Sequence, residues 1–169
     1  DSYIVGHFLG DNALAAVSVA GVGMYLVFSL IIGLTTGVTV VMSQYYGAKE
    51  EDKVVKTFFS SIFIALGMTI LVTVIGLLMT RPLLIVLQTP AEVLDEAVLY
   101  LRIICAGSVG TMLYNWISAV LRSLGNSVVP LIFLGISSLL NIVFDILFVA
   151  VIPMGVGGAA FATVLAQVI

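Results

Sequence analysis

Residues 12–48 read NALAAVSVAGVGMYLVFSLIIGLTTGVTVVMSQYYGA, a run of side chains without a single charge. A helix that crosses the roughly 30 Å hydrocarbon core of a membrane needs about 20 apolar residues. Only helices and closed barrels satisfy their backbone hydrogen bonds in that medium. Because the apolar residues are continuous and do not alternate with polar ones, the run favours a helix over a barrel strand. We therefore predict a membrane-spanning helix over 14–43.

The composition of the rest of the chain points the same way. Of its 169 residues, 62% are hydrophobic and 9% are charged, whereas soluble globular domains carry roughly 25% charged residues. A soluble protein of this size needs more charge to cover its surface. The net charge of −3, with six Lys and Arg residues, gives no basic stripe for nucleic acid, so no nucleic-acid partner is expected. The predicted fold class is an all-α, polytopic transmembrane helix bundle.

Further apolar runs, separated by polar breaks, give the other predicted spans. The full set is 1–9, 14–43, 58–80, 93–121, 128–151 and 156–169. Arg81 and Pro82 are expected to stop the span over 58–80, because proline interrupts a helix. The short apolar stretch 83–90 is expected to lie at the membrane interface. The chain starts without Met and ends inside an apolar run, so we expect a piece of a longer protein whose first and last spans are cut.

Loop charge predicts the orientation of the bundle. The 44–57 loop and the 122–127 turn fall on the same side and share four basic residues, Lys49, Lys53, Lys56 and Arg122. The opposite side has Arg81 and Arg102 beside three carboxylates. Since basic loops tend to stay in the cytoplasm, the 44–57 loop and the 122–127 turn are predicted to be cytoplasmic.

One ionisable residue lies deep in a predicted span. Asp145 follows Asn141 by one helical turn in NIVFD, so both side chains project from one face of the helix. An ionisable residue in a membrane span is costly and is by default a functional candidate. A carboxylate beside an amide can hold a proton or coordinate a cation such as Na⁺. The structural alternative is a protonated Asp145 that only bonds a neighbouring helix.

Other polar side chains in the spans are weaker candidates. Asn115 and Thr163 could each serve a helix–helix hydrogen bond or a ligand contact. Asp1 is the first residue of the given sequence, at the start of the first predicted span. Gly33 and Gly37 form a small-xxx-small pair that lets helices approach closely in lipid. The sequence has no phosphate-binding loop, no Cys/His cluster and no nucleophile–base pattern, so neither an enzyme nor a metal site is predicted.

Several segments, in order and spacing, resemble one transporter family. They are DSYIVGHFLG over 1–10 with ALAAV over 13–17, GLTTG over 33–37 leading to SQYYGAK over 43–49, LRSLGNS over 121–127, NIVFD over 141–145, and GVGGAAFAT over 155–163. Together these segments resemble the MATE (multidrug and toxic compound extrusion) transporters. The resemblance covers the whole chain.

The resemblance implies a twelve-helix transporter with two six-helix lobes around a central cavity. This chain would run from the end of helix 1 through part of helix 6, and its partner would be the carboxyl-terminal lobe of the same protein. The family lies in the cell membrane, in contact with lipid, and exports cationic or amphipathic drugs and toxic compounds in antiport with H⁺ or Na⁺, without a further cofactor.

The resemblance also implies a set of coupling residues. In members with a coupling site in this lobe, the first-helix aspartate corresponds to Asp1, and the fifth-helix pair to Asn141 and Asp145. A polar position on the fourth helix corresponds to Asn115, and a threonine on the sixth to Thr163. Other members hold their coupling carboxylates in the second lobe. We expect Asp145, Asn141, Asp1, Asn115 and Thr163 to form the ion-coupling and substrate cavity.

Two alternatives remain open at this point. A flippase for lipid-linked saccharides belongs to the same superfamily, but it would need a cationic cavity for pyrophosphate, and these spans supply almost no Lys or Arg. A non-transporting membrane assembly protein is the second alternative, and an ion-flux assay would distinguish it from both transporters.

Overall fold

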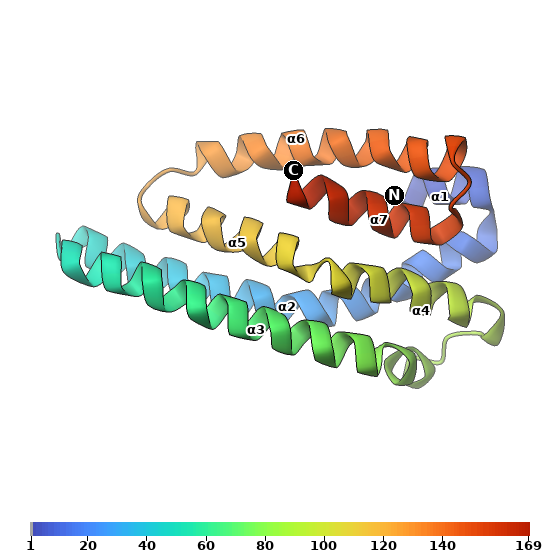
Figure 1. Cartoon of the computed structure of the whole chain (residues 1–169), viewed down its shortest axis with the longest axis horizontal. Coiled ribbons are helices and arrows are strands. Elements are labelled where there is room, and N and C mark those ends of the chain that lie inside the picture. The colour runs from blue at the N-terminus through green and yellow to red at the C-terminus, as the bar shows by residue number, and fades with distance from the viewer. Residues whose placement is uncertain (1) are drawn as a thin grey trace.

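The computed structural model describes residues 2–169, apart from the side chain of Val27. Within this range the chain folds into α-helices joined by short turns, with no strand (Figure 1). The helices are α1 (Ser2–Leu9), α2 (Asp11–Gly47), α3 (Glu51–Val86), α4 (Ala91–Ala106), α5 (Ser108–Ser123), α6 (Val128–Asp145) and α7 (Gly155–Val168), and a π-helical segment η1 (Ile146–Val151) extends α6. An all-α bundle is thus confirmed.

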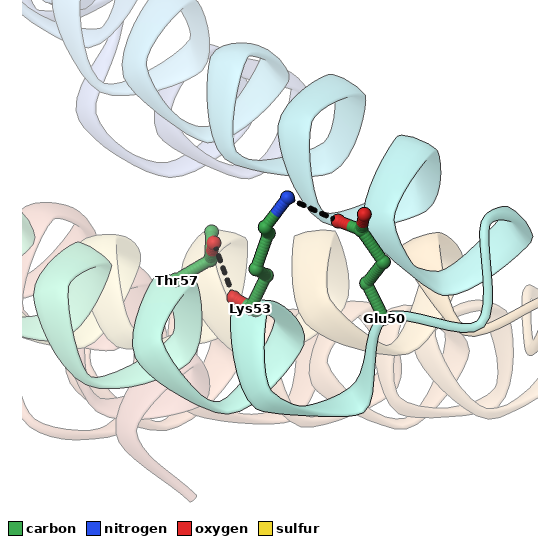
Figure 2. A network of polar contacts seen from close by, with 3 residues as sticks. All are labelled: Glu50, Lys53 and Thr57. Atoms are coloured by element: carbon green, nitrogen blue, oxygen red, sulfur yellow. Dashed lines mark hydrogen bonds and ion pairs between the residues drawn. The ribbon is translucent and has the colours of Figure 1, made fainter.

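The helices lie roughly parallel and antiparallel to one another, so their turns gather at two ends of the bundle (Figure 1). The α2–α3 and α5–α6 turns share one end, and the α1–α2, α3–α4 and η1–α7 connections share the other. The predicted 44–57 loop is mostly helical, because only residues 48–50 lie between α2 and α3. Figure 2 shows this turn, where Lys53 Nζ lies 2.7 Å from Glu50 Oε2 and the Thr57 hydroxyl donates to the Lys53 carbonyl.

The structure corrects the prediction that Pro82 ends its helix. α3 continues through Pro82 to Val86, so residues 83–86 belong to that helix and not to a separate interfacial piece. Proline in a helix interior costs about 3 kcal/mol through the missing N–H and a steric clash. The last turn of α3 buries Leu84 completely and packs Leu83 against the same apolar core, and this burial keeps the turn helical.

The predicted span over 93–121 is two helices that meet at Gly107. The axes of α4 and α5 differ by 48° at that residue. Two contacts hold the bend. The Ser108 and Thr73 hydroxyls are 2.7 Å apart and join the bend to α3, while a Cβ at Gly107 would overlap the Val164 side chain of α7. Only glycine therefore lets α7 approach the bend this closely.

Length and composition make three of the described helices able to cross a membrane, namely Asp11–Gly47, Glu51–Val86 and Val128–Val151. The bent pair of α4 and α5 makes a fourth if it is one span, and α7 is a shorter apolar helix. Many large apolar side chains of these helices are exposed, among them Tyr25, Phe63 and Leu131. Such a surface suits lipid and not water.

Gly76 offers a test of helix packing. A Cβ at Gly76 would lie 2.6 Å from Cys105 Sγ on α4, so Gly76→Ala should destabilise the protein by about 1–3 kcal/mol through overpacking. Gly67→Ala on the same helix is the matched control, because a Cβ there meets nothing within 4 Å. We expect the melting temperature of the full-length parent in detergent to fall for Gly76→Ala only, and to recover in part when Cys105→Ala is added. Equal melting temperatures for the two glycine variants would show that the α3–α4 contact is not this close.

Candidate functional site

Asp145 is the most deeply enclosed charged side chain among the described residues. It is the last residue of α6, and its exposed fraction is 0%. Both carboxylate oxygens are shielded from solvent. The π-helical segment η1 follows directly, and the Ile152 N–H donates to the Leu147 carbonyl five residues back at 2.7 Å. Isolated π-helical turns occur often at functional sites, and this one changes the helical register just beyond the aspartate.

Asn141 lies one turn before Asp145 and connects α6 to α7. Its Nδ2 donates to the Thr163 hydroxyl, with the two atoms 3.4 Å apart. The Thr163 hydroxyl in turn donates to the Ala159 carbonyl of its own helix at 3.1 Å. A hydroxyl has one proton to give and two lone pairs to accept with. Thr163 therefore acts mainly as an acceptor toward the neighbouring helices.

Tyr100 of α4 completes this cluster from a third helix. Its exposed fraction is 2%. The Tyr100 side chain forms a hydrogen bond with Thr163 and lies near enough to Asp145 to interact with its charge. We refer to Tyr100, Asn141, Asp145 and Thr163 as the polar cluster. It joins α4, α6 and α7 next to the buried apolar core.

Small residues bring α7 close enough for these contacts. The first two turns of α7 bury Val156, Gly157, Gly158, Ala159 and Ala160. A Cβ at Gly158 would lie 2.7 Å from the Phe148 carbonyl oxygen of η1, so the two backbones touch there. This contact holds the start of α7 beside the end of α6 and sets Thr163 opposite Asn141.

Asn115 reaches α7 at a different level. Its Nδ2 donates to the Thr111 carbonyl of α5 at 2.8 Å, and the Thr111 hydroxyl donates to the Gln167 side chain of α7. Gln167 is one helical turn beyond Thr163. Asn115 is thus connected to α7 through Thr111 and Gln167, one turn along from the polar cluster.

A groove lies between α5, α6 and the last turns of α7. The open volume there is about 640 Å³. Its walls are mainly apolar, with polar groups from Tyr114, Ser118, Ser137 and Gln167. The Ser137 hydroxyl donates to the Ala166 carbonyl at 2.6 Å and fixes α7 to α6 at the mouth of this volume. The space therefore lies beside a helix end and is not an enclosed chamber.

The structure brings together three of the five residues expected at the site. Asp145, Asn141 and Thr163 share the polar cluster. Asn115 lies on α5 and is joined to α7 through Thr111 and Gln167, one turn from Thr163. Asp1 lies outside the described residues. The sequence analysis missed Tyr100 and Gln167. Each is a side chain capable of hydrogen bonding inside a mainly apolar predicted span, and this property could have identified them.

The polar cluster has one acid and no base. It offers a carboxylate, an amide, a phenol and a hydroxyl, which can hold one proton or supply oxygen ligands to a monovalent cation. A charge enclosed this way is expensive unless it is paired or neutralised. The arrangement is thus suited to binding and releasing a small cation.

Comparison with known proteins identifies the family. The family model described as MatE matches residues 1–147, which is most of the chain. The chain belongs to the MATE family. The resemblance of the sequence segments to MATE transporters is thereby confirmed, and the chain matches part of an integral membrane transporter fold.

Individual relatives agree with this assignment. The chain is 36% identical to "Probable multidrug resistance protein YpnP" of Bacillus subtilis (strain 168), over 99% of this chain and 38% of that protein. It is 28% identical to "Probable multidrug resistance protein NorM" of Thermotoga maritima, over 99% of this chain and 37% of that protein. The chain therefore spans less than two-fifths of the length of these relatives.

A solved structure described as "Crystal structure of MATE in the bent conformation" superposes with a TM-score of 0.94 at 26% identity, over 99% of this chain and 37% of that one. Such a score over nearly the full length means that the order and packing of the helices are those of the MATE fold.

Thr163→Val should weaken the contact between α6 and α7. Valine has nearly the same shape but cannot accept the Asn141 proton, and a buried donor left without its partner costs about 1–3 kcal/mol. We expect a lower melting temperature for the full-length parent in detergent. Thr36→Val is the matched control, because the exposed Thr36 hydroxyl bonds only the Ile32 carbonyl of its own helix. If both variants melted alike, Thr163 would not be the link between the helices.

Proposed function

We propose that the protein to which this chain belongs exports cationic or amphipathic drugs and toxic compounds in antiport with H⁺ or Na⁺. The single observation that carries the proposal is the enclosed carboxylate of Asp145, which lies beside polar side chains of α4, α6 and α7. Membership of the MATE family and the names of the relatives support the multidrug substrates. The polar cluster supplies the coupling site.

The coupling chemistry follows from the single negative charge of the cluster. One proton on Asp145, or one Na⁺ shared by Asp145 and Asn141, cancels that charge. Thr163 and Tyr100 then contribute neutral oxygens around the neutralised group. We expect Asn115 of α5 to contribute through Thr111, whose hydroxyl bonds Gln167 of α7, and Asp1 is the residue that we expect to face the cluster from helix 1.

The free energy available from such a site is large enough to switch a transporter. Moving a two-state equilibrium from 1:99 to 99:1 needs a ligand that prefers one state by about 5.5 kcal/mol. The penalty for an enclosed charge is several kcal/mol per ion. A state that encloses Asp145 is therefore favoured once the carboxylate is neutral, and a state that exposes it is favoured once the ion has left.

The charge of the cluster also bears on the flippase alternative. A pyrophosphate substrate requires cationic partners, and the polar cluster contains none. A carboxylate instead attracts H⁺, Na⁺ or a cationic substrate. Cation-coupled export therefore accounts for the residues of the site better than transport of a lipid-linked pyrophosphate does.

The proposal includes the surroundings of the chain. The carboxyl-terminal lobe of the same protein would pair with this lobe across a central cavity. The protein would lie in the cell membrane, with the turn at residues 48–50 and the turn at residues 124–127 on the cytoplasmic side. Both turns lie at the same end of the bundle (Figure 1), and that end carries Lys49, Lys53, Lys56 and Arg122.

Asp145→Asn tests the coupling site. The amide keeps the shape of the carboxylate but does not titrate near neutral pH. We therefore expect ion-driven efflux to fall about tenfold or more, equivalent to about 1.4 kcal/mol or more of lost coupling free energy. The assay is drug efflux by the full-length parent in inverted vesicles, driven in turn by a pH gradient and a Na⁺ gradient. Asp11→Asn is the control, because Asp11 is exposed in the first turn of α2. Wild-type efflux in Asp145→Asn would overturn the proposed mechanism.

Single-cysteine labelling tests the orientation. Cys105 is buried, so replacing it with alanine removes the native thiol and leaves the surface of the protein unchanged. On intact cells, a membrane-impermeant maleimide should label Glu92→Cys and leave Lys56→Cys unlabelled, because the two positions lie at opposite ends of the bundle. Inverted vesicles should give the reverse pattern. Labelling of Lys56→Cys on intact cells would place the basic end outside.

A further inference from the structure

Arg102 is a charged side chain well inside a membrane helix. It lies eleven residues after Ala91, the first residue of α4, which at 1.5 Å per residue is about 16 Å along the axis. Arg102 is exposed on the surface of the bundle. It therefore belongs to no loop, although the sequence places it on the side of the α3–α4 turn. Ionisable residues at such depth mark functional contacts more often than not.

The surface around Arg102 is one that faces hydrocarbon. Leu99, three residues before it on the same helix, is 50% exposed. Tyr100 and Arg102 are two positions apart, which is about 200° around a helix. Since Tyr100 points into the polar cluster, Arg102 points away from it, toward the outside of the bundle.

No acidic side chain on the described helices is in place to pair with Arg102. Asp95, two turns nearer the end of α4, accepts from Arg81, with Arg81 Nη1 and Asp95 Oδ1 2.9 Å apart. α7 has no carboxylate at all, and those of α3 are Glu51 and Asp52, at the far end of that helix. The guanidinium thus faces an apolar surface with no counter-ion from α3, α4 or α7.

A guanidinium in this position has one good partner in a membrane. Long basic side chains extend along apolar surfaces so that the charge reaches the interface. The exposed Asp95–Arg81 pair lies nearer the α3–α4 end, about 10 Å from Arg102 along the helix. The planar guanidinium forms paired hydrogen bonds with phosphate oxygens. We propose that Arg102 binds the phosphate of an anionic phospholipid in the leaflet nearest the α3–α4 turn, with an acyl chain along Leu99.

A phospholipid fits the apolar surface around Arg102 better than other anionic partners do. A free phosphate ion would have to leave water and enter an apolar surface, whereas a lipid already has its chains there. A carboxylate elsewhere in the protein is the alternative partner, and the melting temperature of Arg102→Leu distinguishes it from a lipid. The measurement of bound lipid does not use transport, so its outcome can be told apart from that of the proposed ion coupling.

The test measures bound lipid on the full-length parent by native mass spectrometry. The protein is purified in a mild detergent and titrated with phosphatidylglycerol, and with phosphatidylcholine as the lipid without net charge. Arg102→Leu should lower the affinity for phosphatidylglycerol about tenfold, equivalent to about 1.4 kcal/mol. Arg102→Lys, which keeps the charge but not the paired geometry, should lose less. Arg81→Leu is the matched control, since it removes an arginine at the same end of the bundle, and should bind phosphatidylglycerol like the wild type.

Three results would overturn the proposal. The first is unchanged phosphatidylglycerol binding in Arg102→Leu. The second is equal loss in Arg81→Leu, which would indicate general charge attraction at this end of the bundle. The third is displacement of the bound lipid by millimolar inorganic phosphate, which would mean that the ion alone fills the site. Leucine suits a lipid-facing position, so Arg102→Leu is expected to fold, and its melting temperature without added lipid should equal that of the wild type. A lower melting temperature there would point to a partner within the protein and would also count against a lipid.

Discussion

The close approach of α7 to its neighbours is the contact on which the rest of the structure depends. Hydrophobic burial gives little driving force between helices in lipid, so association relies on tight packing and on hydrogen bonds. α7 meets η1 at Gly158 and the α4–α5 bend at Gly107, where backbone and side chain leave no room for a Cβ. With these contacts in place, Thr163 faces Asn141 and Tyr100, and the cluster around Asp145 forms. A larger residue at either glycine would separate the helices before it altered any polar group.

The fold follows from features that are visible in the sequence. Apolar runs of membrane length give the helices, and the polar breaks give the turns. The predicted helix bounds were wrong at Pro82 and at Gly107, because contacts with distant parts of the chain decide the structure at both places. Pro82 is tolerated because Leu83 and Leu84 pack into the core, and the bend at Gly107 depends on Thr73 and Val164, which lie far away in the chain. A pattern read along one segment cannot contain either contact.

The site was partly predictable for a similar reason. Asp145 and Asn141 stand out because lipid penalises them, so the sequence alone is enough to select them. Tyr100 is amphipathic and ordinary in a membrane helix, and only the packing of α4 against α7 makes it part of the cluster. The glycines behave likewise. The pair Gly33 and Gly37 looked like a packing seam but meets no neighbour within 4 Å, whereas Gly158 touches backbone.

α4 contacts both the polar cluster, through Tyr100, and the lipid-facing surface, through Arg102. Tyr100 and Arg102 lie on opposite faces of the same rigid helix, one inside the polar cluster and one toward lipid. A change that rotates or shifts α4 when Asp145 gains or loses an ion must also move Arg102 relative to the headgroup layer. Linkage is reciprocal, so a phosphate bound at Arg102 would then favour the state of the ion site in which the guanidinium reaches it best. The size of such coupling is limited by the difference in lipid affinity between the two positions of α4. Anionic lipid could therefore adjust transport without contacting the drug or the ion.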